Sequence, residues 1–170
     1  MKENNLIEIL RPPSKPNDNK INLSNLAMEL PDDYLKFIEV YGTGKISNFI
    51  TIFNCNSQDD DYNLFVQASL ILEDLRFLLE DDPTYYKYNL YPNQDALYPI
   101  GVTDNGDYIF WVTQGNPTEW TIAIIASRSP DVEHTKYNLN DFLFNVLLKK
   151  TNIDSFPSSF PSNIIFEVIN

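Results

Sequence analysis

Residues 97–126 read LYPIGVTDNGDYIFWVTQGNPTEWTIAIIA, and this stretch decides the fold. Two apolar runs, residues 97–102 and 108–112, flank an Asn105-Gly106 dipeptide, which tolerates the positive φ angles of a tight hairpin turn. A third run over residues 120–126 follows after a short link. Parallel strands need crossover connections of a dozen or more residues, so these short links predict an antiparallel sheet.

Helical periodicity appears on both sides of these three runs. A helix is predicted from residues 30–31 to Gly42, because proline suits the first helical position and apolar side chains then recur at helical spacing. Phe37 falls in that apolar stripe and should be buried against the sheet. Two further helices are predicted, over residues 64–80 and from residue 138 to about residue 150.

The order of elements predicts the fold class. Residues 46–53 (ISNFITIF) are β-branched and aromatic, which favours a strand between the first two helices. The chain therefore runs helix, strand, helix, three meandering strands, helix. This order predicts an α+β fold with a mainly antiparallel sheet flanked by helices. Residues 14–20 and 154–162 are rich in turn formers and are interpreted as loops or linkers.

Length and composition predict one domain over residues 1–170, or one domain with tails. One Cys and one His cannot supply the four ligands of a structural zinc site, and a single Cys cannot form an internal disulfide. We therefore expect no metal or cofactor and a reducing, cytoplasmic setting. No basic leader resembling a signal peptide is visible.

The charge distribution narrows the class of partner. The chain holds 24 acidic and 12 basic side chains, and residues 59–133 account for 14 of the acids but only 3 of the bases. Binding to nucleic acid needs clustered Lys and Arg, so nucleic acid is disfavoured as a partner. No apolar stretch approaches the roughly 20 residues of a membrane span, so no membrane partner is expected. The concentrated acidity suits a basic protein partner, or simply solubility.

Several short sequences occur in an order that is similar to that of one known family. LPDDYLKFI (residues 30–38) and YGTG (41–44) resemble the opening helix of that family and the glycine pair that ends it. LYPIG (97–101) and DNGD (104–107) resemble a later strand and its glycine-rich turn. NDFL (140–143) resembles the closing helix, although Asn140 replaces the usual Ser or Thr and the phenylalanine spacing differs. Taken together and in this order, these sequences resemble the SUKH superfamily over about residues 23–150. The resemblance implies a domain core at about 23–150, with an N-terminal segment over 1–22 and a C-terminal extension over 151–170.

The resemblance implies a non-enzymatic, cytoplasmic immunity protein that binds and neutralises a cognate bacterial toxin domain, because the superfamily is best known for this role. It implies that the sheet and its flanking loops, here the strands around residues 108–120, form the toxin-binding surface. An acidic surface of this kind would suit a basic toxin such as a nuclease. An adaptor or regulator of a larger assembly, as for the yeast cell-wall member, and an unrecognised hydrolase remain as alternatives.

Tyrosines 85, 86, 88 and 91 lie between two prolines, in a predicted loop. They either face a partner or cover the edge of the core, and the residues favour neither interpretation. Together with the acidic loops, they complete the predicted partner-binding residues: Asp59, Asp60, Asp61, Tyr85, Tyr86, Asp104, Asp107 and Trp120.

His134 is the one side chain that ordinarily titrates near neutrality, and with Cys55 it could in principle form a nucleophile and base pair. No sequence feature selects a pair of carboxylates for glycosidase-type chemistry. No catalytic motif surrounds Cys55 or His134, so no catalytic residue is predicted. The three consecutive aspartates do not match a calcium-binding loop, and a solvated acidic loop is the expected structure.

Overall fold

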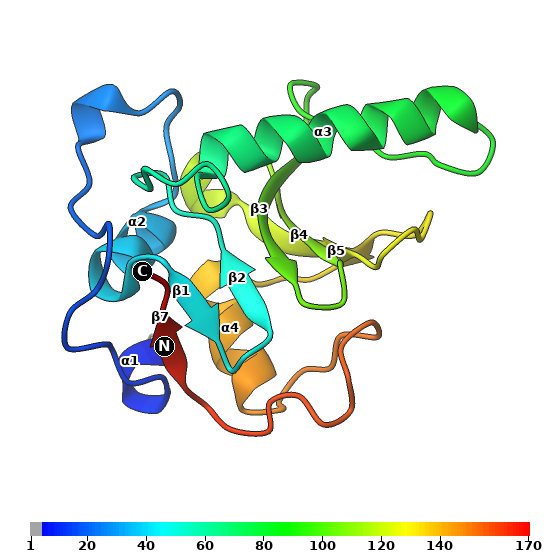
Figure 1. Cartoon of the computed structure of the whole chain (residues 1–170). Coiled ribbons are helices and arrows are strands. Elements are labelled where there is room, and N and C mark those ends of the chain that lie inside the picture. The colour runs from blue at the N-terminus through cyan, green and yellow to red at the C-terminus, as the bar shows by residue number, and fades with distance from the viewer. Residues whose placement is uncertain (1–4) are drawn as a thin grey trace.

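The computed structural model describes residues 5–170, which form one antiparallel sheet with helices on both faces (Figure 1). The strands lie in the order β6-β5-β4-β3-β2-β1-β7. Their bounds are β1 Gly44–Ile46, β2 Ile50–Ile52, β3 Leu97–Thr103, β4 Tyr108–Val112, β5 Thr121–Ile125, β6 Glu133–His134 and β7 Phe166–Val168. The helices are α1 Leu6–Ile9, α2 Asp32–Tyr41, α3 Leu64–Asp81 and α4 Leu139–Leu147, with 3-10 turns η1 Leu23–Asn25 and η2 Pro117–Glu119. The predicted α+β fold is confirmed.

The hairpin between β3 and β4 forms where Asn105-Gly106 predicts it. The Gly106 N–H donates to the Thr103 carbonyl at 3.0 Å, and the Thr103 N–H donates to the Asp107 carbonyl at the same distance. Among the residues of this turn, only Gly106 has a positive φ, +82°. The connection is therefore a three-residue loop with glycine in the left-handed region, rather than the two-residue turn that Asn-Gly most often makes.

The strand predicted over residues 46–53 is a hairpin instead. Ser47 and Asn48 have φ of 50° and 55°, and the Phe49 N–H donates back to the Ile46 carbonyl at 3.0 Å. Positive φ at both central residues is the mark of a type I′ turn, which reverses the chain between β1 and β2. The prediction of one strand is wrong because the turn contains no glycine to signal it.

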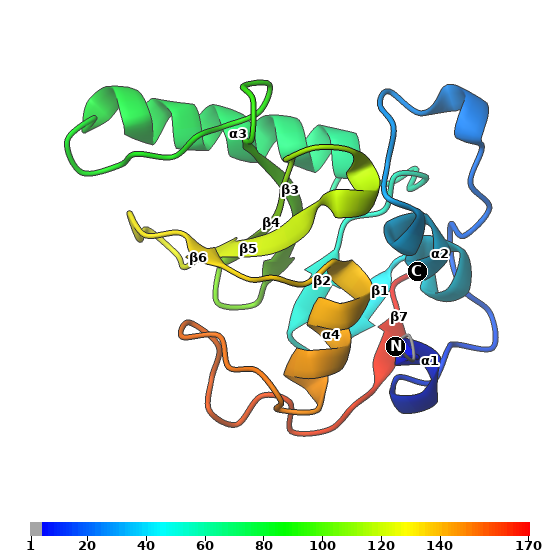
Figure 2. The same ribbon diagram turned by 180° about the vertical axis from the view of Figure 1, so that it is seen from behind.

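The helices divide between the two faces of the sheet. α3 packs along β3 on one face, and α2 and α4 pack together on the other (Figures 1 and 2). In β4 the neighbouring side chains of Phe110 and Trp111 point to opposite faces, and both are fully buried. The central strands are thus covered from both sides.

α2 matches its prediction closely. It begins after Pro31, ends at Gly42 and buries Tyr34, Phe37, Ile38 and Tyr41 on one face. Gly42 has φ of +68°, and a Cβ atom there would lie 2.0 Å from the Asn17 carbonyl oxygen. Glycine is therefore required at this position both by the backbone conformation and by the close approach of the N-terminal segment.

The two ends of the chain meet at one edge of the sheet. β7 pairs with β1, and the Asn17 side-chain amide donates to the Ile169 carbonyl at 2.9 Å. Phe156 and Phe160 pack on Phe49 with ring centroids 5.2 and 5.0 Å away. Residues 154–162 lack regular structure, as the turn formers predict, but they are held against the core by these rings.

Replacing Tyr34 with Phe is expected to destabilise the fold by about 1–3 kcal/mol. The Tyr34 hydroxyl donates to the Phe53 carbonyl at 2.7 Å and accepts from the Cys55 N–H at 2.9 Å, and the side chain is fully buried. Its loss leaves two buried backbone groups unpaired. Urea unfolding measures the change, with Tyr85→Phe at an exposed hydroxyl as the control. Equal stability of the two variants would contradict the prediction.

Candidate functional site

The predicted binding residues do not form one surface. Asp59, Asp60 and Asp61 lie in the loop before α3, whereas Tyr85 and Tyr86 lie in the turn after it. α3 has 18 residues, so about 27 Å of helix separates the two groups. The remaining predicted residues are Asp104 and Asp107 in the β3–β4 turn and Trp120 just before β5.

The acidic loop before α3 is a solvent-facing structure. The Asp61 N–H donates to the Asp59 carboxylate at 3.0 Å, and the Gln67 side chain donates to the Asp60 carbonyl at 2.8 Å. Asn63 caps α3 by accepting from two N–H groups of its first turn. All three aspartates are exposed. Within residues 5–170, no cluster of His, Cys, Asp or Glu could hold a metal ion.

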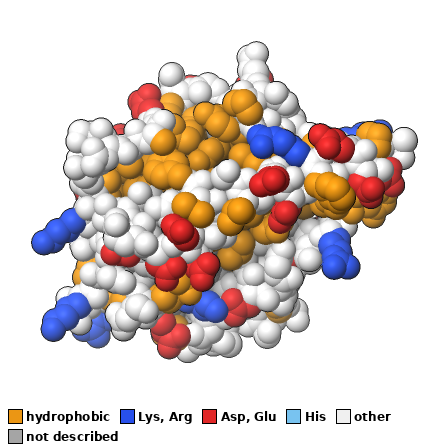
Figure 3. Space-filling view, turned by 45° about the horizontal axis from the view of Figure 1, so that its top comes forward, with side chains coloured by type: hydrophobic (Ala, Val, Ile, Leu, Met, Phe, Trp, Pro, Cys, Tyr) orange, Lys and Arg blue, Asp and Glu red, His pale blue; other side chains and the backbone are white. Residues whose placement is uncertain are grey.

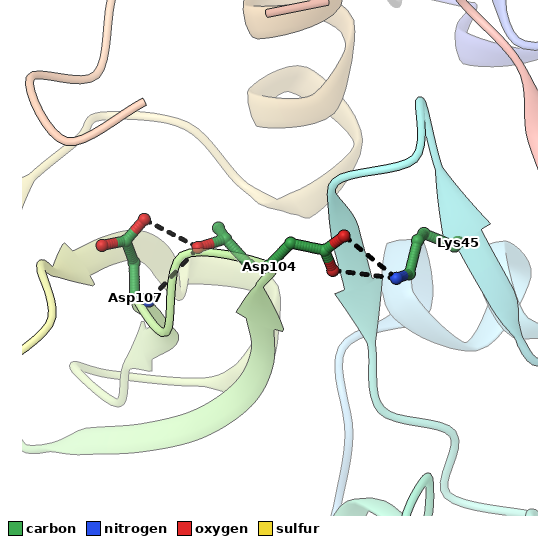
Figure 4. Close-up of polar contacts among 4 residues, drawn as sticks. Lys45, Asp104 and Asp107 are labelled. Carbon is green, nitrogen blue, oxygen red and sulfur yellow. Dashed lines mark hydrogen bonds and ion pairs between the residues drawn. The ribbon is translucent and has the colours of Figure 1, made fainter. Parts of the chain in front are cut away.

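The two aspartates of the β3–β4 turn have different surroundings (Figure 4). Asp104 is half-exposed and forms an ion pair with Lys45, 2.8 Å between Nζ and Oδ1. Asp107 is only 3% exposed, and it accepts from the Thr103 hydroxyl at 2.7 Å and the Ser127 N–H at 3.2 Å. The Asp107 carboxylate holds the turn against the strand end of β5. Asp107 was predicted to contact a partner, but its buried carboxylate is out of a partner's reach.

Trp120 and the strands around residues 108–120, which were also predicted to bind a partner, are largely buried. Trp120 is 8% exposed, packs on Trp111 with ring centroids 5.5 Å apart, and donates from its indole nitrogen to the Gly115 carbonyl at 3.2 Å. Because Ile109, Phe110 and Trp111 are buried on both faces of β4, these strands offer no open face. The expectation of a sheet surface that binds a partner is wrong at this place.

The tyrosines divide between the two interpretations that their sequence allows. Tyr85 is 52% exposed and meets the half-buried Tyr86 edge to face, with ring centroids 4.8 Å apart. Tyr88 is buried and donates its hydroxyl to the Ser129 carbonyl, and burial raises its pKa to about 12. Tyr88 therefore covers the core edge, whereas the ring of Tyr85 is free to meet a partner.

The structure shows a surface that the sequence interpretation missed. We call it the outward face of α3, made of the exposed residues Leu70, Glu73, Asp74, Phe77, Glu80 and Asp81. Figure 3 shows hydrophobic and acidic side chains intermingled along this helix. The signal was present in the sequence, because Leu70 and Phe77 fall outside the inward stripe formed by the buried residues of α3.

Residues 24–143 match a known protein family. A family model, SUKH_6, described as SMI1-KNR4 cell-wall, matches residues 24–143, more than two thirds of the chain. The chain belongs to the SUKH family. No curated protein and no solved structure matches it. Within residues 5–170, no helix is long and apolar enough to span a bilayer.

The SUKH match covers only part of the folded unit. It begins in η1 and ends in α4, so it includes β1 to β6 and the whole of α3. α1 and β7 lie outside the matched residues, although both pack on the core. The outward face of α3 and the acidic loop thus belong to the SUKH region, whereas the sheet edge made by β7 does not.

A cavity of about 890 Å³ lies between α1, α2 and α4. Asp33 lines it and accepts from the Asn140 N–H at 3.2 Å, while burial raises the pKa of its carboxyl group. Neither Cys nor His is among the described residues that line the cavity. Those residues therefore do not provide the cysteine-histidine pair that the sequence leaves open.

Cys55 and His134 lie far apart in this SUKH fold. Cys55 is buried just beyond β2, and burial raises the pKa of its thiol. His134 is exposed in β6, which is four strands away at about 4.8 Å per strand spacing. A thiol with a raised pKa and no base within reach is a poor nucleophile. These two residues cannot act as a catalytic pair in this conformation.

Replacing Cys55 with Ala and His134 with Gln together is expected to leave partner binding within about twofold of the unchanged chain. Neither side chain belongs to an exposed acidic or aromatic surface, and substitutions away from binding surfaces have small effects. Isothermal titration with the partner proposed below measures the effect. Loss of binding by a folded double variant would contradict this expectation and would place at least one of the two side chains at the binding surface.

Proposed function

We propose that this SUKH protein is a non-enzymatic immunity protein, which binds a cognate toxin domain in the cytoplasm and neutralises it. The family match over residues 24–143 carries this proposal, because immunity to bacterial toxins is the role for which the superfamily is best known. The excess acidity of residues 59–133 and the exposed carboxylates before and along α3 support a basic partner.

Neutralisation would work by occupation of the basic surface of the toxin. A nuclease holds phosphates with Arg and Lys side chains, and carboxylates accept the same charge-assisted hydrogen bonds. The net charge of −12 would also steer the encounter, since opposite potentials raise association rates. No chemical step on the toxin is required.

Coexpression tests the proposal directly. If a large secreted protein is encoded beside this chain, the C-terminal domain of that protein is the candidate toxin. Expressed alone in bacteria, that domain should stop growth, and coexpression of this chain should restore it. An unrelated soluble protein of similar acidity serves as the control, and it should give no protection. Growth arrest that persists with this chain present would refute the immunity assignment.

A regulatory adaptor is the second candidate, and the description of the matched family favours it by naming the cell wall. An adaptor would bind a component of a cell-wall assembly and would give no protection against a neighbouring toxin. Deletion of the gene would then alter sensitivity to cell-wall antibiotics, whereas deletion of an immunity gene would not. The two phenotypes separate the candidates.

A further inference from the structure

The outward face of α3 exposes large hydrophobic side chains on one line. Leu70 and Phe77 are seven residues apart, close to two helical turns, and are 51% and 66% exposed. Among residues 5–170, five large hydrophobic side chains are exposed over about half of their surface or more. Leu70, Phe77 and Tyr85 are three of them, and all lie on α3 or in the turn after it. Exposed apolar groups gathered in this way mark contact surfaces.

Acidic side chains surround these apolar groups. Residues 64–82 contain five acids and a single base, Arg76. The Arg76 guanidinium donates to the Tyr91 carbonyl at 2.7 Å and thus already has a partner within the chain. At the other end of α3, the loop of Asp59, Asp60 and Asp61 extends the same sign of charge.

The end of α3 carries charges that disfavour the helix itself. Glu80 and Asp81 lie in its last turn, which holds no basic residue and where the helix dipole is negative. An exposed Phe77 one turn earlier adds a second local disadvantage. Places where a chain departs from locally favourable choices are most often functional sites. The two departures coincide on one face.

We propose that the outward face of α3 is the docking surface for a basic protein, with Phe77 and Leu70 inserted in an apolar recess of that partner. This inference rests on the proposed function, which makes the partner the toxin domain. Opposite charge around an apolar centre is the arrangement that such a partner complements. A second copy of the chain would place acid against acid, and nucleic acid or an anionic membrane would be repelled.

The two kinds of side chain should act on different rate constants. An aromatic anchor buried at the centre of an interface slows dissociation. Carboxylates around it act over roughly 10 Å at 0.1 M salt and speed association. Surface binding kinetics with the purified toxin domain can therefore test each part of the surface separately.

The first variant is Phe77→Ala, with Leu23→Ala as its matched control. Leu23 is 65% exposed, almost the same as Phe77, but it lies in η1 and away from α3. Phe77→Ala should weaken binding about tenfold or more, mainly through faster dissociation. Leu23→Ala should leave binding within about twofold. Neither change removes a buried side chain, so both variants should stay folded.

The second variant neutralises Glu73, Glu80 and Asp81 as Gln, Gln and Asn. It should slow association about threefold or more and flatten its dependence on salt. Removal of acids from the end of α3 should leave its thermal stability unchanged or higher. Weaker binding by an equally stable or more stable protein cannot be attributed to unfolding. The control carries the same change of charge at the exposed residues Glu39, Asp154 and Glu167.

The outcomes separate this inference from the proposed function. If the unchanged chain binds the toxin domain and both α3 variants bind equally well, the docking surface is elsewhere and the immunity assignment stands. If the unchanged chain does not bind the toxin domain, both the immunity assignment and the docking surface on α3 are refuted. A dimer of this chain that Phe77→Ala dissociates would assign the face to a second copy and overturn the inference.

Discussion

A chain that lacks residues 154–170 is expected not to fold cooperatively. The deletion removes β7 together with Phe156, Phe160 and Phe166, all of which pack on the core. Full burial of one large apolar side chain contributes about 1.5–3 kcal/mol, so these three, of which Phe160 and Phe166 are partly buried, contribute at most roughly 5–9 kcal/mol. Domains of this size are stable by only about 5–15 kcal/mol in total. The deletion also leaves Phe49 and the edge of β1 uncovered.

Near-ultraviolet circular dichroism and urea unfolding measure this effect. The deletion variant should lose the near-ultraviolet signal of packed aromatic rings, whereas removal of Asn170 alone should change nothing, since that residue is exposed. A cooperative transition within about 2 kcal/mol of the full chain would contradict the prediction. That result would show that the SUKH-matched region folds without the C-terminal extension.

Truncating Phe37 to Ala is expected to destabilise the fold by about 3–5 kcal/mol, the usual loss for a buried aromatic ring. Phe37 is buried on α2 and packs on Tyr41 with ring centroids 4.8 Å apart. It also meets Phe166 of β7 edge to face at 6.4 Å. The same ring thus links the first long helix to the last strand.

Chemical denaturation of Phe37→Ala and Glu39→Ala tests this packing. Glu39 is exposed on the same helix, so its change should stay within about 0.5 kcal/mol and should report helix propensity alone. A loss below about 1 kcal/mol for Phe37→Ala would show that this face of α2 is not the one that supports the sheet.

Local patterns predicted the elements whose signals lie within a few neighbouring residues. The Asn-Gly turn, the three central strands and the spacing of apolar residues in α2 and α3 all act over one or two turns of chain. The β1–β2 hairpin was not predicted because Ser47 and Asn48 adopt positive φ angles in a turn that contains no glycine. β7 was not predicted because it has only three residues and its partner strand lies more than 100 residues earlier in the chain.

The candidate site was harder to predict, because exposure depends on tertiary packing. Asp104 and Asp107 are three residues apart in one turn. Asp104 faces solvent, whereas Asp107 is buried and its carboxylate accepts a hydrogen bond from Thr103. Nothing in the local sequence distinguishes them. The exposure of Phe77 could have been predicted, because its position lies off the buried stripe of α3.

The order of the strands also determines when the sheet can be completed during synthesis. From β1 to β6 each strand pairs with the one made just before it, so this meander can assemble as the ribosome delivers it. β7 is made last and pairs with β1, where Lys45 lies opposite Glu167. Until residue 168 has emerged, the nascent chain carries an open strand edge beside the exposed ring of Phe49. An open strand edge can pair with the edge of another incomplete chain and cause aggregation, so a chaperone would be needed at this stage.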